Sequence, residues 1–244
     1  MLFSEYLMKN IDCSIAIGYE PKLEFSINKI FKDSNVDFFQ EYDAMDDFSM
    51  MYFFENLAKK WESFDIIING IAFFEAVDSD KYINTSRENF RKSMDITCYA
   101  FTKTLFFAKD LMKFGGVCLG FTAYGARKHI DNYNVLGVAK AALESSVRYL
   151  AAELGPVGIR INLISCAFIR TSSAYSLKGF RKNINWQVVN APIQRALTHD
   201  DILYAALFLL SDYSSYITGE IMNLDGGYNI LGAKNRNSLD MEVN

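Results

Sequence analysis

The sequence predicts a single α/β domain organised around a doubly wound, parallel β-sheet. Short apolar stretches alternate with longer segments of helical periodicity, which is typical of βαβ units. The chain has 244 residues, enough for one such domain with a full core. We find no internal repeat and no linker-like stretch, so we expect residues 1–233 to form one domain and residues 234–244 to form a polar tail.

The first half of the chain is predicted to supply three of the strands and three helices. Each predicted strand is rich in Ile, Phe or Val and ends at a polar or turn-forming residue. Each predicted helix carries apolar residues at helical spacing. The strands are Asp12–Tyr19, Val36–Tyr42 and Asp65–Ile68, and the helices are Leu23–Phe31, Met50–Trp61 and Thr85–Lys113.

The second half continues the alternation. Apolar residues recur at helical spacing after Tyr133 as far as Leu154, which predicts a helix with one broad buried face. Ser172–Asn190 is a polar and aromatic connection with some helical pattern, and Lys234–Asn244 is polar enough to fray. The remaining elements are strands at Gly116–Phe121, Arg160–Ser165 and Glu220–Leu224, and a helix at Asp200–Leu210.

Composition excludes several classes of function. A net charge of -4 gives no basic surface for nucleic acid, and no stretch reaches the length of a membrane-spanning helix. The N-terminus lacks the features of a signal peptide, and the four cysteines form no C-x-x-C pair, so we expect free thiols in the cytoplasm. With only His129 and His199, and no ligand at suitable spacing, we expect no metal site.

Polar and turn-forming residues follow each predicted strand. In open α/β sheets, ligands bind beyond the carboxyl ends of the strands, so these residues are expected to line one crevice. They are Glu20, Asp43, Asn69 to Ala72, Thr122 to Tyr124 and Ala167 to Thr171.

Tyr133 and Lys140 are the candidate chemical groups of this crevice. Seven residues are nearly two helical turns, so both side chains project from almost the same side. An ammonium near a phenol favours the phenolate, and the pair together can polarise a carbonyl group while the Lys binds sugar hydroxyls. The alternative is a packed ring and a solvated charge.

The segment Asn132 to Ala141 resembles the active-site helix of bacterial enoyl-acyl carrier protein reductases of the short-chain dehydrogenase superfamily. Most of that superfamily has Tyr and Lys four positions apart, whereas seven positions are typical of the enoyl reductases. The resemblance extends from about Cys13 to Gly232, and its further matches include Gly155 to Ser165, Ile169-Arg170-Thr171 and Thr218-Gly219-Glu220. It implies a Rossmann-like domain.

The resemblance implies NADH-dependent reduction of a trans-2-enoyl-acyl carrier protein in type II fatty-acid synthesis, by a homotetramer. Tyr133 would stabilise charge on the thioester oxygen, and Lys140 would hold the nicotinamide ribose. Glu20 would bind the adenosine ribose and repel a 2′-phosphate, which favours NADH over NADPH. A solvated loop charge is the alternative for Glu20.

Further site residues follow from the resemblance alone. Asp43 and Ala44 would flank the adenine, Ile71 would contact the cofactor through its backbone, and Phe74 would touch substrate. Residues on the nicotinamide and pyrophosphate side would be Ile169, Arg170, Thr171, Ser172 and Ser173. Tyr175, Phe180 and Trp186 match a substrate lid, where aromatic rings serve equally often as core packing.

Three departures from the family pattern stand out. We expect the first strand and its glycine-rich, phosphate-binding turn to be missing, because the first glycine is Gly18. Weaker NADH binding and open sheet edges would follow. A second active-site tyrosine of the family falls at Ala123, with Tyr124 next to it as a tentative substitute. Ala167-Phe168 replaces a Gly-Pro pair, so that Phe168 would crowd the nicotinamide.

Two hypotheses therefore stay open. The chain is either the NADH-dependent reductase or a catalytically impaired relative that keeps the fold for oligomer assembly. A different short-chain reductase with a shifted site is a third and weaker interpretation.

Overall fold

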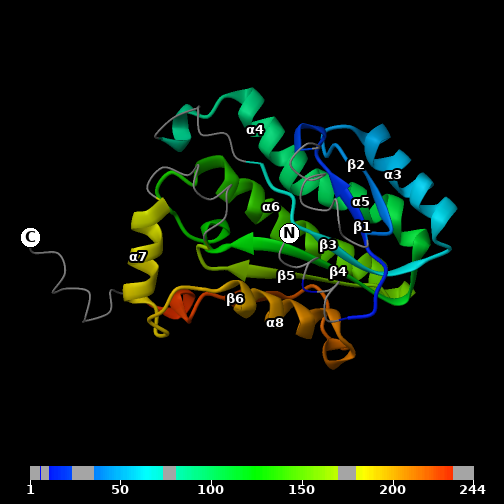
Figure 1. Ribbon diagram of the computed structural model, residues 1–244. Coiled ribbons are helices and arrows are strands. Elements are labelled where there is room, and N and C mark those ends of the chain that lie inside the picture. The colour runs from blue at the N-terminus through cyan, green and yellow to red at the C-terminus, as the bar shows by residue number, and fades with distance from the viewer. Residues whose placement is uncertain (1–5, 7–10, 24–35, 74–80, 170–179, 233–244) are drawn as a thin grey trace, which may run out of the picture.

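A computed structural model of the protein describes residues 6, 11–23, 36–73, 81–169 and 180–232. It confirms the predicted doubly wound, parallel sheet with helices on both faces. In Figure 1 the helices α3, α5 and α6 cover one face and α8 covers the other. The arrowheads of β4 and β5 point toward α7, so α7 lies near the carboxyl edge where ligands of such sheets bind.

Every strand pairing in the described residues is parallel, and the strands form two sheets. The smaller sheet has the order β1-β2 and the larger has the order β3-β4-β5-β6. Their bounds are Ala16–Tyr19 for β1, Phe38–Glu41 for β2, Phe64–Asn69 for β3, Met112–Ala123 for β4, Arg160–Cys166 for β5 and Ile221–Leu224 for β6.

Within the described residues β1 pairs only with β2, and β3 pairs only with β4. Ile66 in β3 is 46% exposed, which is unusual for an apolar residue of a parallel sheet. The two sheets are nevertheless connected through α5. The hydroxyl groups of Tyr42 and Thr104 are 2.6 Å apart, and Asn69 Nδ2 donates to Thr104 Oγ1 at 3.4 Å.

The helices before β4 depart from the prediction at one place. The predicted helix Thr85–Lys113 is divided into α4 (Arg87–Met94), a π-helical turn η4 (Asp95–Tyr99) and α5 (Ala100–Ala108). After α5 and one 3-10 turn the helical region ends at Leu111, because Met112 pairs with Phe64 and extends β4 toward its N-terminus. The helix α3 (Asp47–Lys60) begins at Asp46, whose side chain accepts from Phe48 N.

After β4 come α6 (Asn134–Leu154), α7 (Phe180–Asn190) and α8 (His199–Leu210). A capping box between Thr198 and Asp201 begins α8. Short 3-10 turns complete the chain at η1 (Pro21–Leu23), η3 (Tyr82–Asn84), η5 (Lys109–Leu111), η6 (Tyr124–Ala126), η7 (Gly155–Val157), η9 (Asp212–Ser214) and η10 (Tyr228–Ile230).

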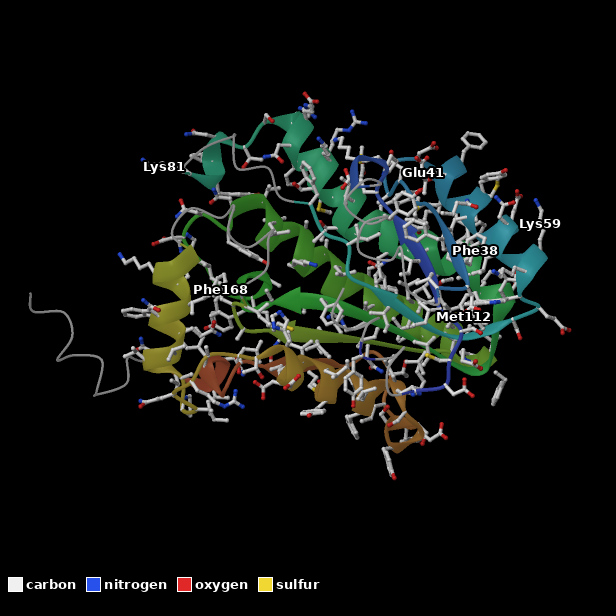
Figure 2. The ribbon with its side chains drawn as sticks, in the orientation of Figure 1. Phe38, Glu41, Lys59, Lys81, Met112 and Phe168 are labelled. Carbon is white, nitrogen blue, oxygen red and sulfur yellow. The ribbon has the colours of Figure 1, made fainter. Side chains whose placement is uncertain are left out.

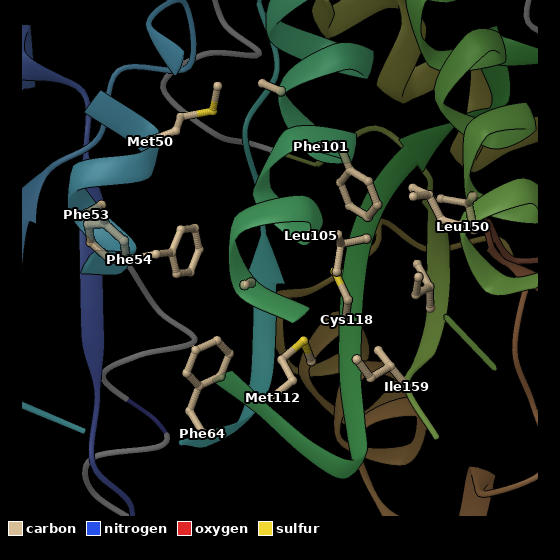
Figure 3. Close-up of a cluster of buried hydrophobic side chains, with 14 of the residues drawn as sticks. Met50, Phe53, Phe54, Phe64, Phe101, Leu105, Met112, Cys118, Leu150 and Ile159 are labelled. Atoms are coloured by element: carbon tan, nitrogen blue, oxygen red, sulfur yellow. The ribbon is translucent and has the colours of Figure 1, made fainter. Parts of the chain in front are cut away.

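The core has two parts, one on each face of the larger sheet. The larger cluster includes Met50, Leu105 and Ile161, and Figure 3 shows it between α3, α5 and the strands. The smaller cluster joins Leu119 and Ile164 to Ala206 and Leu209 of α8. Both faces of β4 and β5 are covered by side chains of the core. A ligand can therefore reach these strands only at their ends. Figure 2 places Met112 at the amino end and Phe168 at the opposite end, near α7.

Candidate active site

Tyr133 lies immediately before α6 and is only 7% exposed. Its neighbours Asn132 and Asn134 have φ of 63° and 41°. Positive φ is unfavourable for most residues but tolerated by Asn, so the local sequence suits this bend.

The Tyr133 ring packs directly against the backbone of Gly125. A Cβ atom at residue 125 would lie 2.4 Å from Tyr133 Cδ1, a distance that no side chain tolerates. Gly137, on the first turn of α6, is equally constrained, because a Cβ there would lie 2.6 Å from the Gly125 carbonyl oxygen. These two glycines therefore allow the loop after β4, the ring and α6 to meet.

Lys140 is buried on α6, and its Nζ donates a hydrogen bond of 2.7 Å to the carbonyl oxygen of Phe121 in β4. Burial lowers the pKa of Lys140 to about 8, and the charges of Cys166 and Glu144 act in the opposite direction. Tyr133 responds to the charges of the same residues, Cys166 and Glu144. Tyr133 and Lys140 therefore share one neighbourhood at the carboxyl ends of β4 and β5.

Burial raises the pKa of Tyr133, and Cys166 and Glu144 raise it further. The expectation that the Lys140 ammonium favours the phenolate is therefore wrong for this arrangement, because burial, Cys166 and Glu144 all act to raise the pKa of Tyr133. The hydroxyl stays protonated across the physiological pH range. It can act as a hydrogen-bond donor to an oxygen that gains negative charge.

Glu144, which sequence reasoning missed, organises the other side of this neighbourhood. Its carboxylate is buried and accepts from Thr122 Oγ1 and from Arg127 Nε, both at 3.0 Å. Arg127 also donates to Asn223 Oδ1 in β6 at 3.0 Å. In the sequence, Glu144 could have been found as a carboxylate one helical turn after Lys140. No sequence pattern indicated that Arg127 would pair with Glu144.

Tyr124 has a different environment from Tyr133. Its ring packs on Tyr228 at a centroid distance of 5.2 Å and an interplanar angle of 70°. Burial, Tyr228 and Asp225 raise its pKa, in that order. Ala123 is the last residue of β4, so the one-residue shift sends the Tyr124 ring toward the turn after β6.

Comparisons with known proteins identify the family. The family model described as "Enoyl-(Acyl carrier protein) reductase" matches residues 8–229. The chain belongs to this family. It is 44% identical over 191 residues to "Enoyl-[acyl-carrier-protein] reductase [NADH] 1" of Rhizobium meliloti, covering 78% of this chain and 70% of that protein. It is 39% identical to the NADH enoyl reductase FabI of Rickettsia typhi, covering 86% of this chain and 81% of that protein.

Solved structures agree with this assignment. FabI from Candidatus Liberibacter asiaticus superposes with a TM-score of 0.90 at 34% identity, over 96% of this chain and 91% of that one. The enoyl reductase of Anaplasma phagocytophilum, solved in complex with NAD, superposes with a TM-score of 0.84 at 36% identity, over 91% and 84%. The predicted family and its Rossmann-like fold are confirmed.

The cofactor residues expected from the enoyl reductase pattern follow the first three strands. Glu20 is exposed after β1, with Lys22 Nζ 3.9 Å from its carboxylate. Asp43, after β2, accepts from Met45 N at 2.9 Å, and Ala44 packs on the core. Ile71, after β3, donates its N–H to Asn69 Oδ1 at 3.1 Å.

Phe168 and Ile169 follow β5 and lie at the carboxyl edge of the sheet in different environments. Ile169 is half-buried in the strand exit. Phe168 donates its N–H to Gln187 Oε1 of α7 at 2.9 Å, so the residue that replaces the family's proline connects the strand exit to α7. The other predicted residues lie outside the described part of the chain, namely Phe74, Arg170, Thr171, Ser172, Ser173 and Tyr175.

Within the described ranges, no group of three or more His, Cys, Asp or Glu side chains is arranged to hold a metal ion. No helix in the described part has both the length and the apolarity that crossing a membrane requires.

Proposed function

We propose that the protein catalyses the NADH-dependent reduction of trans-2-enoyl-acyl carrier protein to acyl-acyl carrier protein in type II fatty-acid synthesis. Membership of a family whose relatives carry this name supports the activity. The observation that carries the mechanism is the buried pair Tyr133 and Lys140 at the carboxyl edge, beside Cys166.

Tyr133 is assigned to the thioester carbonyl of the substrate. NADH, when bound, supplies the hydride for the β-carbon of the enoyl group. Negative charge then builds on the thioester oxygen as the enolate forms, and a protonated phenol that donates to this oxygen stabilises charge present mainly in the transition state. The raised pKa of Tyr133 keeps this proton in place.

Lys140 is assigned to the ribose next to the nicotinamide. A pKa of about 8 leaves the ammonium mostly charged at neutral pH. The Phe121 carbonyl oxygen takes one N–H of Lys140, which fixes Nζ in place and leaves further N–H groups for sugar hydroxyls. Its role is thus to orient the cofactor relative to Tyr133.

The donor and acceptor groups that follow the strands fit a nicotinamide dinucleotide. The exposed carboxylate of Glu20 accepts ribose hydroxyls and repels a 2′-phosphate, which favours NADH over NADPH. Asp43 and Ala44 would flank the adenine, and Ile71 would contact the cofactor. Ile169, together with Arg170, Thr171, Ser172 and Ser173, would hold the nicotinamide and pyrophosphate, and Phe74 would contact substrate.

The substrate is a thioester of acyl carrier protein, and the proposed assembly is a cytoplasmic homotetramer. Exposed aromatic residues on α5 and just before it support contact between subunits, since Tyr99 is 45% and Phe106 is 55% exposed. On α6 the exposed aromatic is Tyr149, at 70%. Molecular mass in solution, measured by light scattering, tests the oligomeric state.

The deciding experiment measures oxidation of NADH and NADPH by the purified protein with a crotonyl thioester. We expect turnover with NADH and much weaker turnover with NADPH. Absence of turnover with either cofactor, in protein shown to be folded by circular dichroism, would contradict the proposed activity.

One observation favours the second candidate, a catalytically impaired relative that keeps the fold for assembly. Within the described residues β1 pairs only with β2 and β3 only with β4, so each of these strands has one unpaired edge. A tetramer that is folded but does not bind NADH would support this candidate. Tyr124 is the second candidate for a catalytic hydroxyl.

A further inference from the structure

The helix α7 is fixed to the sheet by contacts in its C-terminal half. Trp186 Nε1 donates to the Tyr228 hydroxyl at 3.0 Å, and Gln187 Oε1 accepts from Phe168 N at 2.9 Å. Phe168 follows β5, and Tyr228 follows β6. The helix is therefore held against the exits of two neighbouring strands.

The turn that carries Tyr228 is itself rigid. The buried carboxylate of Asp225 accepts from Gly227 N at 3.0 Å and from Asn229 N at 2.9 Å. Gly226 O accepts from Ile193 N at 3.0 Å, just beyond the end of α7. A Cβ at Gly227, whose φ is 85°, would lie 3.0 Å from Pro192, so turn and segment are in close contact.

Tyr124 adds the exit of β4 to this arrangement, because its ring packs on Tyr228 at 5.2 Å. The three rings Tyr124, Trp186 and Tyr228, called here the aromatic cluster, thus connect the segments after β4 and β6 with α7. Tyr124 is next to Gly125, the residue on which the Tyr133 ring packs. A continuous set of contacts thus leads from α7 through Tyr228 and Tyr124 to Gly125, on which the Tyr133 ring packs.

We propose that Tyr228 and Trp186 are positioning residues that fix α7 over the carboxyl edge and thereby select the length of the acyl group that the crevice accepts. This inference rests on the proposed reductase function. The indole of Trp186 is 38% exposed, so apolar surface remains on the helix for contact with an acyl chain. If α7 is displaced, the space available to a long acyl chain should change more than the space available to a four-carbon acyl chain.

The test compares Tyr228→Phe, Trp186→Phe and the double variant, with Tyr216→Phe as the control because Tyr216 is fully exposed. Tyr228→Phe keeps the ring and removes only the hydroxyl that accepts from Trp186. We expect KM for a trans-2-dodecenoyl thioester to rise about threefold to tenfold, the effect of one lost hydrogen bond, while values for a crotonyl thioester and NADH stay near wild type. The double variant should be no worse than either single variant.

Fluorescence gives a second readout that does not depend on turnover. Trp61→Phe leaves Trp186 as the sole indole, since the chain has 2 Trp. In that background Tyr228→Phe should increase the acrylamide quenching of Trp186, and Tyr216→Phe should not. Unchanged quenching together with unchanged acyl-length preference would overturn the proposal, and so would additive effects in the double variant.

The outcomes separate this inference from the proposed function. If the wild type reduces no enoyl thioester, the reductase assignment fails by itself. Dissociation constants of the wild type and Tyr228→Phe for the same two thioesters, measured by calorimetry, then decide whether the cluster selects acyl length. If the ratio of the two dissociation constants, dodecenoyl to crotonyl, is the same in the wild type and in Tyr228→Phe, the proposal is overturned.

Discussion

Lys140 Nζ lies 2.7 Å from the carbonyl oxygen of Phe121, a residue of the strand β4 that α6 covers. This hydrogen bond fixes a buried cation at the carboxyl edge of the sheet. Burial of the cation costs free energy, which shows in the lowered pKa of Lys140. Such a cost is typical of functional sites, where a charge is held ready for a ligand.

The first prediction concerns the Tyr133 hydroxyl. Tyr133→Phe should lower the turnover of a crotonyl thioester by about tenfold or more, because the variant cannot donate to the developing enolate oxygen. The free energy of unfolding should change little, since the ring is kept. Tyr124→Phe should lower turnover less, because the Tyr124 ring packs on Tyr228. Turnover of Tyr133→Phe equal to wild type would remove Tyr133 from the mechanism.

The second prediction concerns the pH dependence of stability. The pKa of Lys140 falls from 10.5 to about 8 on folding, so between these values the unfolded chain binds the extra proton. The contribution of Lys140 to the free energy of unfolding therefore rises as the pH rises from about 8 to 10.5, by roughly 3 kcal/mol in total. Lys140→Met removes this contribution.

Urea unfolding of wild type and Lys140→Met at several pH values gives the difference curve, in which other titrating groups cancel. Above about pH 8, the free energy of unfolding of the wild type should rise relative to that of the variant. A difference that is independent of pH would show that Lys140 keeps an ordinary pKa.

The third prediction orders two variants of the ion pair between Glu144 and Arg127 by their effect on stability. Glu144 has a side chain 8% exposed, whereas that of Arg127 is 35% exposed. Arg127→Met leaves a buried carboxylate without its cation and should cost about 2–4 kcal/mol in the free energy of unfolding. Glu144→Gln keeps the shape and an acceptor, and the remaining guanidinium can reach water, so its cost should be smaller.

Chemical denaturation measures both variants, with Lys128→Met as the control because Lys128 is an exposed neighbour of Arg127. The reverse order, with Glu144→Gln the more damaging variant, would mean that the carboxylate is better hydrated than its burial indicates.

The fourth prediction concerns the contact between Gly125 and Tyr133. Gly125→Ala places a methyl group 2.4 Å from Tyr133 Cδ1, so the ring or the loop after β4 must move. We expect a loss of about 1–3 kcal/mol in stability and a fall in turnover larger than that of Gly155→Ala. Gly155 is the matched control, because a Cβ there meets nothing within 4 Å.

The sequence alone determined the order of the described strands and helices and the meeting of the strand exits at one edge of the sheet. Alternation between apolar stretches and helical periodicity is a local property, and parallel strands then place their exits together. The sequence also identified Tyr133 and Lys140 as candidates, but it placed both on one helix, whereas Tyr133 lies just before α6, between two Asn residues of positive φ. Prediction and structure agree on the order of the described elements, whereas the predicted helix Leu23–Phe31 lies almost entirely outside the described residues.

Only the tertiary structure decided how each side chain is used. Glu144 meets Arg127 and Thr122, Tyr124 turns to Tyr228, and β4 extends to Met112, through contacts between residues distant in sequence. The pKa of Tyr133 depends on burial by neighbours from several elements, so it rises where the sequence predicted a fall. Periodicity encodes which face of an element is buried, but the partner that buries it, and the water it excludes, are set by the packing of the whole chain.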